Sequence, residues 1–198
     1  MKERGIILCD WQVQAVLDGR KTRHTVPVEP QPPEGWGGIS DTYALATHCP
    51  FGKVGDRLWV KETWWHERLS DQENAAFGDG TMLSRYDKGT GKIFRIPGWT
   101  PTAPHWRKRP SIHMPRWASR ITLEITGVRV ERVHEITEED ARAEGIDMDV
   151  PKAPHVPGMG ATHPSAVFSD LWDSSYAKRG FGWDSNPWVW AITFEVIK

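Results

Sequence analysis

The chain has 198 residues, and its 25 lysines and arginines against 26 aspartates and glutamates give a formal net charge of −1. That balance excludes a uniformly basic nucleic-acid-binding tail and an acidic disordered chain, so any nucleic-acid site has to be a local patch. Two cysteines are too few for a disulfide-rich secreted scaffold, and the length suits one domain that folds without disulfides or metal.

The N-terminal segment predicts a strand followed by a helix. Residues 6–9 are apolar, which is typical of a short buried strand and would place Cys9 in the core. Asp10 is suited to cap a helix over residues 11–18, because its side chain can accept a hydrogen bond from the first turn. Gly19 is expected to end that helix.

The next segments predict one further strand between two loops. Residues 20–25 are expected to form an exposed basic turn that leads into a strand. Residues 27–55 are rich in proline and glycine and predict a long loop insertion. Residues 57–65 alternate in polarity and predict a strand. Residues 66–110 have weak periodicity and predict a second insertion, with one short hairpin near residues 93–96.

The pattern is clearer beyond this insertion. Apolar and polar residues alternate over residues 121–133, and Gly127 predicts a bend or bulge within that strand. Thr137 is a good N-cap for a helix over residues 138–144, whose first turn is acidic, and Gly145 is expected to close it.

The C-terminal part predicts a loop insertion at residues 147–164, a helix capped by Ser165, and a final strand over residues 188–196. Strands dominate the regular segments and only two or three helices accompany them. The expected fold class is therefore α+β, a small mixed β-barrel with helices and loop insertions in a single domain, 1–198. Most of the 12 tryptophans are expected in the core, and a few in a ligand groove.

Five strings in the same order resemble one known family. Residues 17–22 (LDGRKT), 55–60 (GDRLWV), 109–115 (RPSIHMP), 137–141 (TEEDA) and 186–190 (NPWVW) are similar to those of the ASCH family of the PUA-like superfamily, most closely its phage- and prophage-encoded members. The resemblance covers nearly the whole chain. It implies a PUA-like barrel with a helix-lined cleft that binds RNA or modified nucleobases.

Some small bacterial ASCH proteins are N4-acetylcytidine amidohydrolases, and this resemblance implies three site residues. Lys21 matches their catalytic lysine and Glu144 their catalytic glutamate. Their catalytic threonine lies three residues after the lysine, where this chain has His24. The hydroxyl could instead come from Thr25, which needs a bulge in the strand, or from Thr22.

The residues themselves leave other roles open. Lys21 could form a salt bridge or contact a phosphate rather than take part in catalysis. His24 could activate a water molecule as a general base, or line a groove and contact a ligand. Glu144 lies in an acidic run, most of which is expected to be a solvated face.

Residues 105–120, the basic segment, carry five lysines and arginines and no acidic residue. Basic groups interleaved with indole rings suit single-stranded nucleic acid, since cations contact phosphates and rings stack on bases. A basic loop that balances the acidic helix is the alternative. The candidate contacts, with Arg20 and Arg23 as an extension of the patch, are Trp106, Arg107, Lys108, Arg109 and Trp117.

Three functions follow from these patterns. The first is a metal-independent amidohydrolase of N4-acylated cytidine-type substrates, the second a non-catalytic RNA or modified-base binding module, and the third, weaker, a ribonuclease using Lys21 and His24.

We expect no metal and no other cofactor, since no ligand spacing is present. The expected partner is a modified nucleoside or single-stranded RNA. No apolar run reaches 18 residues and no signal peptide is evident, so no membrane association and a cytoplasmic location are expected.

Overall fold

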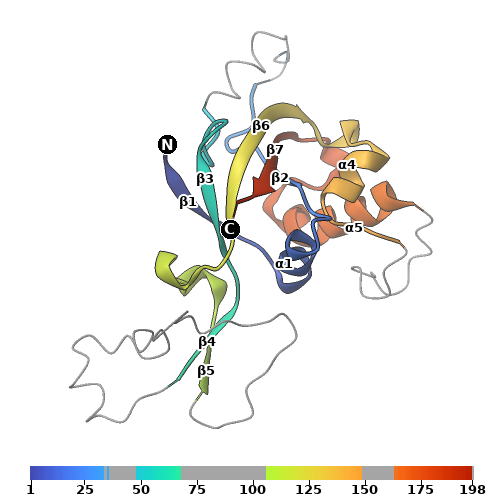
Figure 1. Ribbon diagram of the computed structural model, residues 1–198. Coiled ribbons are helices and arrows are strands. Elements are labelled where there is room, and N and C mark those ends of the chain that lie inside the picture. The colour runs from blue at the N-terminus through green and yellow to red at the C-terminus, as the bar shows by residue number, and fades with distance from the viewer. Residues whose placement is uncertain (34, 36–47, 68–105, 149–162, 198) are drawn as a thin grey trace.

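The computed structural model describes residues 1–33, 35, 48–67, 106–148 and 163–197 (Figure 1). The hairpin expected near residues 93–96 lies outside these residues, as do residues 34, 36–47, 68–105 and 149–162 of the three expected loop insertions. Among the described residues, no helix is long and apolar enough to cross a bilayer.

Five strands form the main sheet, in the order β1-β3-β6-β7-β2. β1 pairs in parallel with β3, and the other neighbours are antiparallel. The strands are β1 (Glu3–Ile7), β2 (Arg23–Pro27), β3 (Arg57–Lys61), β6 (Thr122–Arg132) and β7 (Trp188–Val196). The expected α+β class with a mixed sheet is confirmed. Residues of both edge strands, β1 and β2, line one hollow, so the sheet curls. Among the described strands no hydrogen-bonded ladder joins β1 to β2, so the sheet does not close into a barrel.

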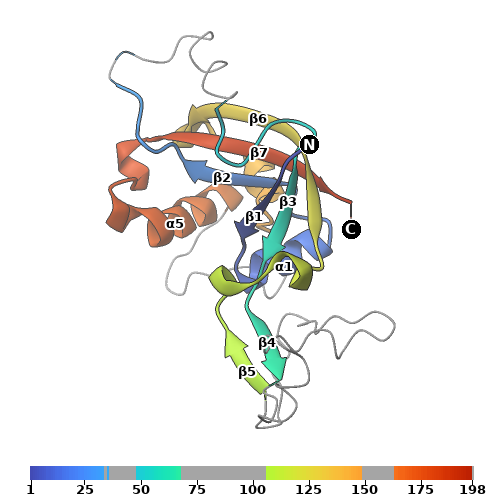
Figure 2. The same cartoon turned by 90° about the vertical axis from the view of Figure 1, so that its left-hand side faces the viewer.

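Three α-helices and a separate two-stranded ribbon complete the described fold (Figures 1 and 2). The ribbon projects from one end of the sheet, away from α4 and α5. The helices are α1 (Asp10–Leu17), α4 (Glu138–Ala143) and α5 (Pro164–Tyr176), and the ribbon consists of β4 (Trp64–Glu67) and β5 (Trp106–Arg109). Short 3-10 helices are η2 (Ser111–His113), η3 (Arg116–Ala118), η4 (Val133–Glu135), η5 (Ala177–Arg179) and η6 (Trp183–Ser185).

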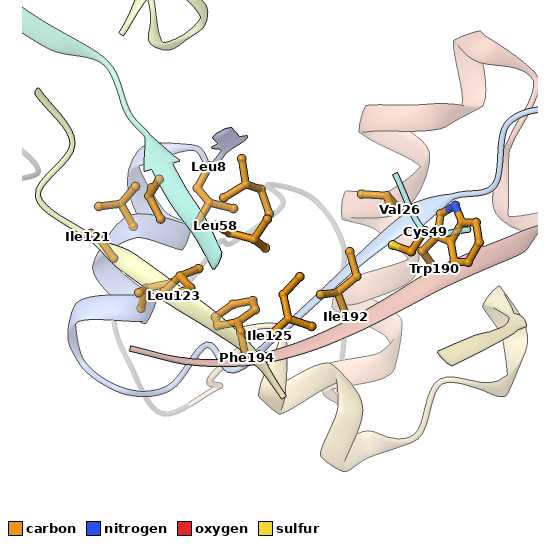
Figure 3. Close-up of a cluster of buried hydrophobic side chains, with 14 of the residues drawn as sticks. Leu8, Val26, Cys49, Leu58, Ile121, Leu123, Ile125, Trp190, Ile192 and Phe194 are labelled. Atoms are coloured by element: carbon orange, nitrogen blue, oxygen red, sulfur yellow. The ribbon is translucent and has the colours of Figure 1, made fainter. Parts of the chain in front are cut away.

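The main core fills the inside of the curled sheet. Apolar side chains from β2, β3, β6 and β7 converge there (Figure 3), and α1 adds Val13 and Val16. A second cluster joins α4 and α5 to the other face of β7. Because β7 is covered on both faces, its residues 188–192 are all buried rather than alternating in exposure. The residues labelled in Figure 3 are Leu8, Val26, Cys49, Leu58, Ile121, Leu123, Ile125, Trp190, Ile192 and Phe194.

An expected bulge and an expected helix cap are confirmed. β6 shifts register between Ile125 and Gly127, as the glycine predicts, and Thr137 caps α4 through a 3.1 Å hydrogen bond from the Asp140 amide. The strand expected at 57–65 is instead broken after Lys61, and its second part belongs to the ribbon.

Two helix starts differ from expectation. Cys9, not Asp10, is the N-cap residue of α1, and its side chain is exposed rather than in the core. His163, not Ser165, caps α5, because Pro164 already occupies the first helical position and cannot donate an amide proton. In both cases helical geometry begins earlier than expected, by one residue in α1 and by two in α5.

Gly145, which follows α4, packs closely against Ala15 and Lys21. It has φ of +95°, and an added Cβ would lie 2.7 Å from Ala15 Cβ and 3.1 Å from Lys21 Cβ. Gly145→Ala is therefore expected to lower the free energy of unfolding by about 3 kcal/mol, through left-handed strain and overpacking. Urea denaturation measures this loss. Gly19→Ala is the control, because Gly19 has φ of +73° with nothing within 4 Å, and it is expected to cost about 1 kcal/mol. Equal losses would contradict the close packing.

Candidate active site

The ends of α1 and α4 lie side by side and position the start of β2. After Gly19 the backbone amides of Arg20 and Lys21 both donate to the Ala15 carbonyl, at 2.8 and 2.9 Å. The Thr22 amide then donates to the Ala143 carbonyl at 2.8 Å, and Lys21 forms an isolated bridge with Glu144. The turn that was expected to be exposed is thus packed against the C-terminal end of α4.

Lys21 is buried at this junction, at 1% exposure. Its Nζ donates to Glu144 Oε2 at 2.6 Å, to the Arg23 carbonyl at 2.6 Å and to the Glu144 carbonyl at 3.1 Å. Three acceptors satisfy all the donors of an ammonium group. Lys21 and Glu144 were both expected at the site from the sequence, and the structure brings their charged atoms into direct contact.

Thr25 completes the contact with Glu144. Its Oγ1 donates to Glu144 Oε1 at 2.5 Å and accepts from Arg23 Nε at 3.3 Å. Residues 23 and 25 share a face of β2, whose pairing with β7 runs in register from Arg23 to Pro27 without a bulge. The bulge expected to be needed for Thr25 is therefore absent. Thr22, the other candidate hydroxyl, is exposed.

Arg23 links this contact to a larger set of carboxylates. Its guanidinium pairs with Glu131 and Asp140 at its two ends, and its Nε lies 3.9 Å from Glu144 Oε1. Arg23 is 1% exposed, so its expected place in an exposed basic patch is wrong. We call this set of contacting polar side chains the charge cluster; Glu131 and Asp140 are half-buried and the others are buried. Its members are Lys21, Arg23, Thr25, Glu131, Asp140 and Glu144.

The charge cluster keeps Glu144 and Asp140 ionised at neutral pH. Burial works to raise the pKa of Glu144, but the Lys21 ammonium and the hydrogen bonds from Lys21 and Thr25 hold it below its usual value. The same opposition acts on Asp140, where burial is outweighed by the Arg23 guanidinium together with the hydrogen bonds from Thr137, and the pKa is lowered. An ionised Glu144 can accept a proton from the Thr25 hydroxyl.

Two neighbouring hollows open beside the charge cluster. The aromatic hollow has a volume of about 340 Å³ and is lined by Thr25 and Glu144 together with Trp11, Phe168, Trp172 and Tyr176. The inter-edge hollow has a volume of about 520 Å³ and lies between β1 and β2, with Phe51, Trp190 and Arg179 among its walls. Both volumes are in the range of small-molecule sites.

His24 borders both hollows but does not join the charge cluster. It lies on the face of β2 opposite Thr25, as neighbouring strand residues do, and is 8% exposed. Its Nδ1 has no hydrogen-bond partner among the described residues. Burial, and secondarily the charge of Lys21, lowers the pKa of His24 to about 4.

This lowered pKa predicts an acid-sensitive fold. The unfolded chain, with an ordinary histidine pKa of 6.5, binds a proton that the folded chain takes up only near pH 4, so stability falls as pH drops through this window. Between pH 7 and pH 5 the contribution of His24 is a loss of about 2 kcal/mol. Its charged neighbours are Lys21, which disfavours protonation, and Glu144, which favours it. Urea denaturation at both pH values is expected to show this loss in wild type and not in His24→Phe. An equal loss in both proteins would contradict it.

The other expected nucleic-acid residues lie elsewhere. Arg20 is half-buried, and its guanidinium donates to the Gly145 carbonyl at 3.0 Å and to Asp18 at 2.8 Å. Arg109 is exposed at the end of β5, and Trp117 is 45% exposed and meets Trp64 edge to face. The described residues of the basic segment are not among those lining either hollow. The side chains of Trp106, Arg107 and Lys108 lie outside the described part of the structure.

The aromatic side chains of α5 were not among the expected site residues. Phe168, Trp172 and Tyr176 lie on the helix that was expected after Ser165, and they line the aromatic hollow. Their spacing of four residues puts three rings in one row along α5. That row of rings is the sequence signal that could have indicated a flat, apolar ligand.

Comparison with known proteins finds similar chains among solved structures only. No family model and no curated protein sequence matches the chain. The crystal structure of protein EF3133 from Enterococcus faecalis V583, of family model DUF984, is 10% identical with a TM-score of 0.44, covering 100% of this chain and 80% of its own. The crystal structure of an ASCH domain from Lactobacillus crispatus JV V101 is 11% identical with a TM-score of 0.46, covering 98% and 79%.

Proposed function

We propose that this protein is an amidohydrolase that needs no metal and acts on N4-acylated cytidine-type substrates. The observation that carries the proposal is the Thr25 hydroxyl, which is held between Glu144 and Arg23 and borders an aromatic hollow. A hydroxyl in contact with a carboxylate is the arrangement of an activated nucleophile. The match of Lys21 and Glu144 to the catalytic lysine and glutamate of the ASCH amidohydrolases, which the resemblance implies, supports the same substrate class.

The chemistry can be written with the residues present. Thr25 Oγ1 attacks the carbonyl carbon of the N4-acyl group while its proton passes to Glu144, 2.5 Å away. The bond between the acyl carbon and N4 then breaks, and N4 takes the proton from Glu144 as the amine leaves. Water hydrolyses the acyl ester on Thr25, releasing the carboxylic acid and restoring the hydroxyl. The aromatic rings of α5 supply flat apolar faces for the pyrimidine.

Lys21 has a positioning role in this scheme. It is not among the residues that line the aromatic hollow, and its three hydrogen bonds hold the carboxylate and backbone of Glu144. The Lys21 ammonium orients Glu144 Oε1 toward Thr25 by binding Oε2. Lysine therefore acts through the carboxylate and not as the base itself.

The test is direct hydrolysis. Purified protein is incubated with N4-acetylcytidine, and the ultraviolet spectrum is followed as it changes to that of cytidine, with and without EDTA. Turnover unaffected by EDTA is expected. Turnover abolished by EDTA and restored by added metal would contradict the metal-free scheme, and no turnover would contradict the proposed activity.

One observation favours a second function, binding without turnover. The three donors of the Lys21 ammonium all have acceptors, and each carboxylate of the charge cluster pairs with Lys21, Arg23 or Arg129 without any substrate. A PUA-like binding module for modified bases or RNA would keep the hollows without using Thr25. Binding of N4-acetylcytidine in the absence of any hydrolysis identifies this alternative.

A further inference from the structure

The aromatic hollow and the inter-edge hollow meet at shared residues. Ile7, His24 and Tyr176 line both of them. Since the proposed chemistry uses only the aromatic hollow, the larger inter-edge hollow has no assigned role. A ligand whose amide lies against Thr25 and that extends past His24 would enter it.

His24 is placed to contact such a ligand. The ring is more than nine-tenths buried, and Nδ1 has no hydrogen-bond partner among the described residues. A buried polar atom without a partner is costly, so a ligand group that satisfies it gains affinity. Because β2 is the edge strand of the sheet, Thr25 on one face and His24 on the other both reach the aromatic hollow. One molecule can therefore touch both residues.

The charges around the inter-edge hollow balance. Glu29 and Arg179 line it and pair with each other at 2.5 Å. Burial raises the pKa of Tyr176 to about 12 and lowers that of His24 to about 4, so both are neutral at physiological pH. In the aromatic hollow, Glu144 is balanced by Lys21 behind it. A lining without uncompensated charge suits an uncharged ligand.

We propose that His24 is a specificity-determining residue, whose Nδ1 hydrogen-bonds the non-reacting, uncharged part of a nucleoside-type amide that extends from the aromatic hollow into the inter-edge hollow. This inference rests on the proposed function. It makes the substrate an uncharged nucleoside rather than a nucleotide, because a phosphate in the inter-edge hollow would face the Glu29 carboxylate and break its pair with Arg179.

The experiment compares His24→Phe, which keeps a flat ring and removes Nδ1, with His24→Asn, whose amide places a polar atom close to the position of Nδ1. For N4-acetylcytidine, His24→Phe is expected to raise KM about tenfold with kcat within about twofold of wild type. His24→Asn is expected to keep KM within about threefold. His134→Phe is the matched control, because His134 is exposed and bonds the Trp183 carbonyl away from both hollows.

Binding of the product provides a readout that does not depend on turnover. Quenching of tryptophan fluorescence by cytidine gives Kd, and His24→Phe is expected to raise it about tenfold. Cytidine 5′-monophosphate is expected to bind wild type more weakly than cytidine. Circular dichroism confirms that each variant is folded.

The outcomes separate this inference from the proposed function. If wild type hydrolyses N4-acetylcytidine and His24→Phe keeps the wild-type KM and Kd, the role of His24 is wrong and the activity stands. If nothing is hydrolysed but cytidine binds and His24→Phe weakens it, the ligand contact stands and the activity is wrong. If wild type binds cytidine 5′-monophosphate more tightly than cytidine, the inference that the ligand is uncharged is overturned. Equal losses in His24→Phe and His24→Asn indicate a packing role and overturn the hydrogen bond.

Discussion

Replacing Lys21 with methionine is expected to lower the free energy of unfolding by about 3 to 5 kcal/mol. Methionine has a similar length but no charge, so Glu144 would keep its negative charge in a buried site without the ammonium that compensates it. Three hydrogen bonds of Nζ are lost with it. Urea denaturation of both proteins at neutral pH measures the loss.

Two further variants make this prediction specific. Lys61→Met removes the same charge from a half-buried side chain, whose Nζ binds the Ile112 carbonyl and lies 5.1 Å from the centre of the Trp59 ring, and is expected to cost about 1 kcal/mol or less. Adding Glu144→Gln to Lys21→Met removes the carboxylate charge that has lost its ammonium partner, and is expected to restore part of the stability. If Lys21→Met were as stable as Lys61→Met, the buried ion pair would not exist in solution.

Replacing Thr25 with valine is expected to reduce kcat on N4-acetylcytidine by at least about 10³-fold. Valine keeps the branched shape and removes the hydroxyl that contacts Glu144 at 2.5 Å. The loss of that buried hydrogen bond to a charged group is also expected to cost about 2 kcal/mol of stability. Initial rates are therefore measured at a temperature where circular dichroism shows both proteins folded.

Matched variants identify which hydroxyl acts. Thr25→Ser keeps an oxygen at the same position and is expected to retain kcat within about tenfold. Thr22→Val removes the exposed hydroxyl of the same string and is expected to leave the rate unchanged. A rate lost in Thr22→Val and kept in Thr25→Val would move the nucleophile to residue 22.

The hydroxyl that these variants test lies one residue later in β2 than the family resemblance implies. The resemblance places the catalytic hydroxyl at position 24, but the chain has histidine there and threonine at 25. Side chains alternate across a strand, so only one of the two can face Glu144. The regular pairing of β2 with β7 puts Arg23 and Thr25 on that side and His24 on the other. The departure from the family pattern is thus accompanied by a hydroxyl one position later.

The sequence by itself determined much of the local structure. Alternating apolar residues predicted β6 and β7, with β7 expected at the residues where it is found, and a threonine followed by acidic residues predicted the start of α4. Such signals lie within one segment of the chain, so the periodicity and the capping chemistry can be recognised without a fold. The pairing of Lys21 with Glu144 was expected only because two short strings resembled a family.

The tertiary structure alone decided what these residues do together. Lys21 and Glu144 are 123 positions apart, and their contact requires the end of α1 to pack on the end of α4. Residues 20–25 were expected to form an exposed basic turn. In the fold, Lys21 and Arg23 of this segment are each 1% exposed and pair with carboxylates. Composition and spacing cannot distinguish a solvated cation from a buried one, because the difference lies in which distant carboxylates the fold brings within hydrogen-bond distance.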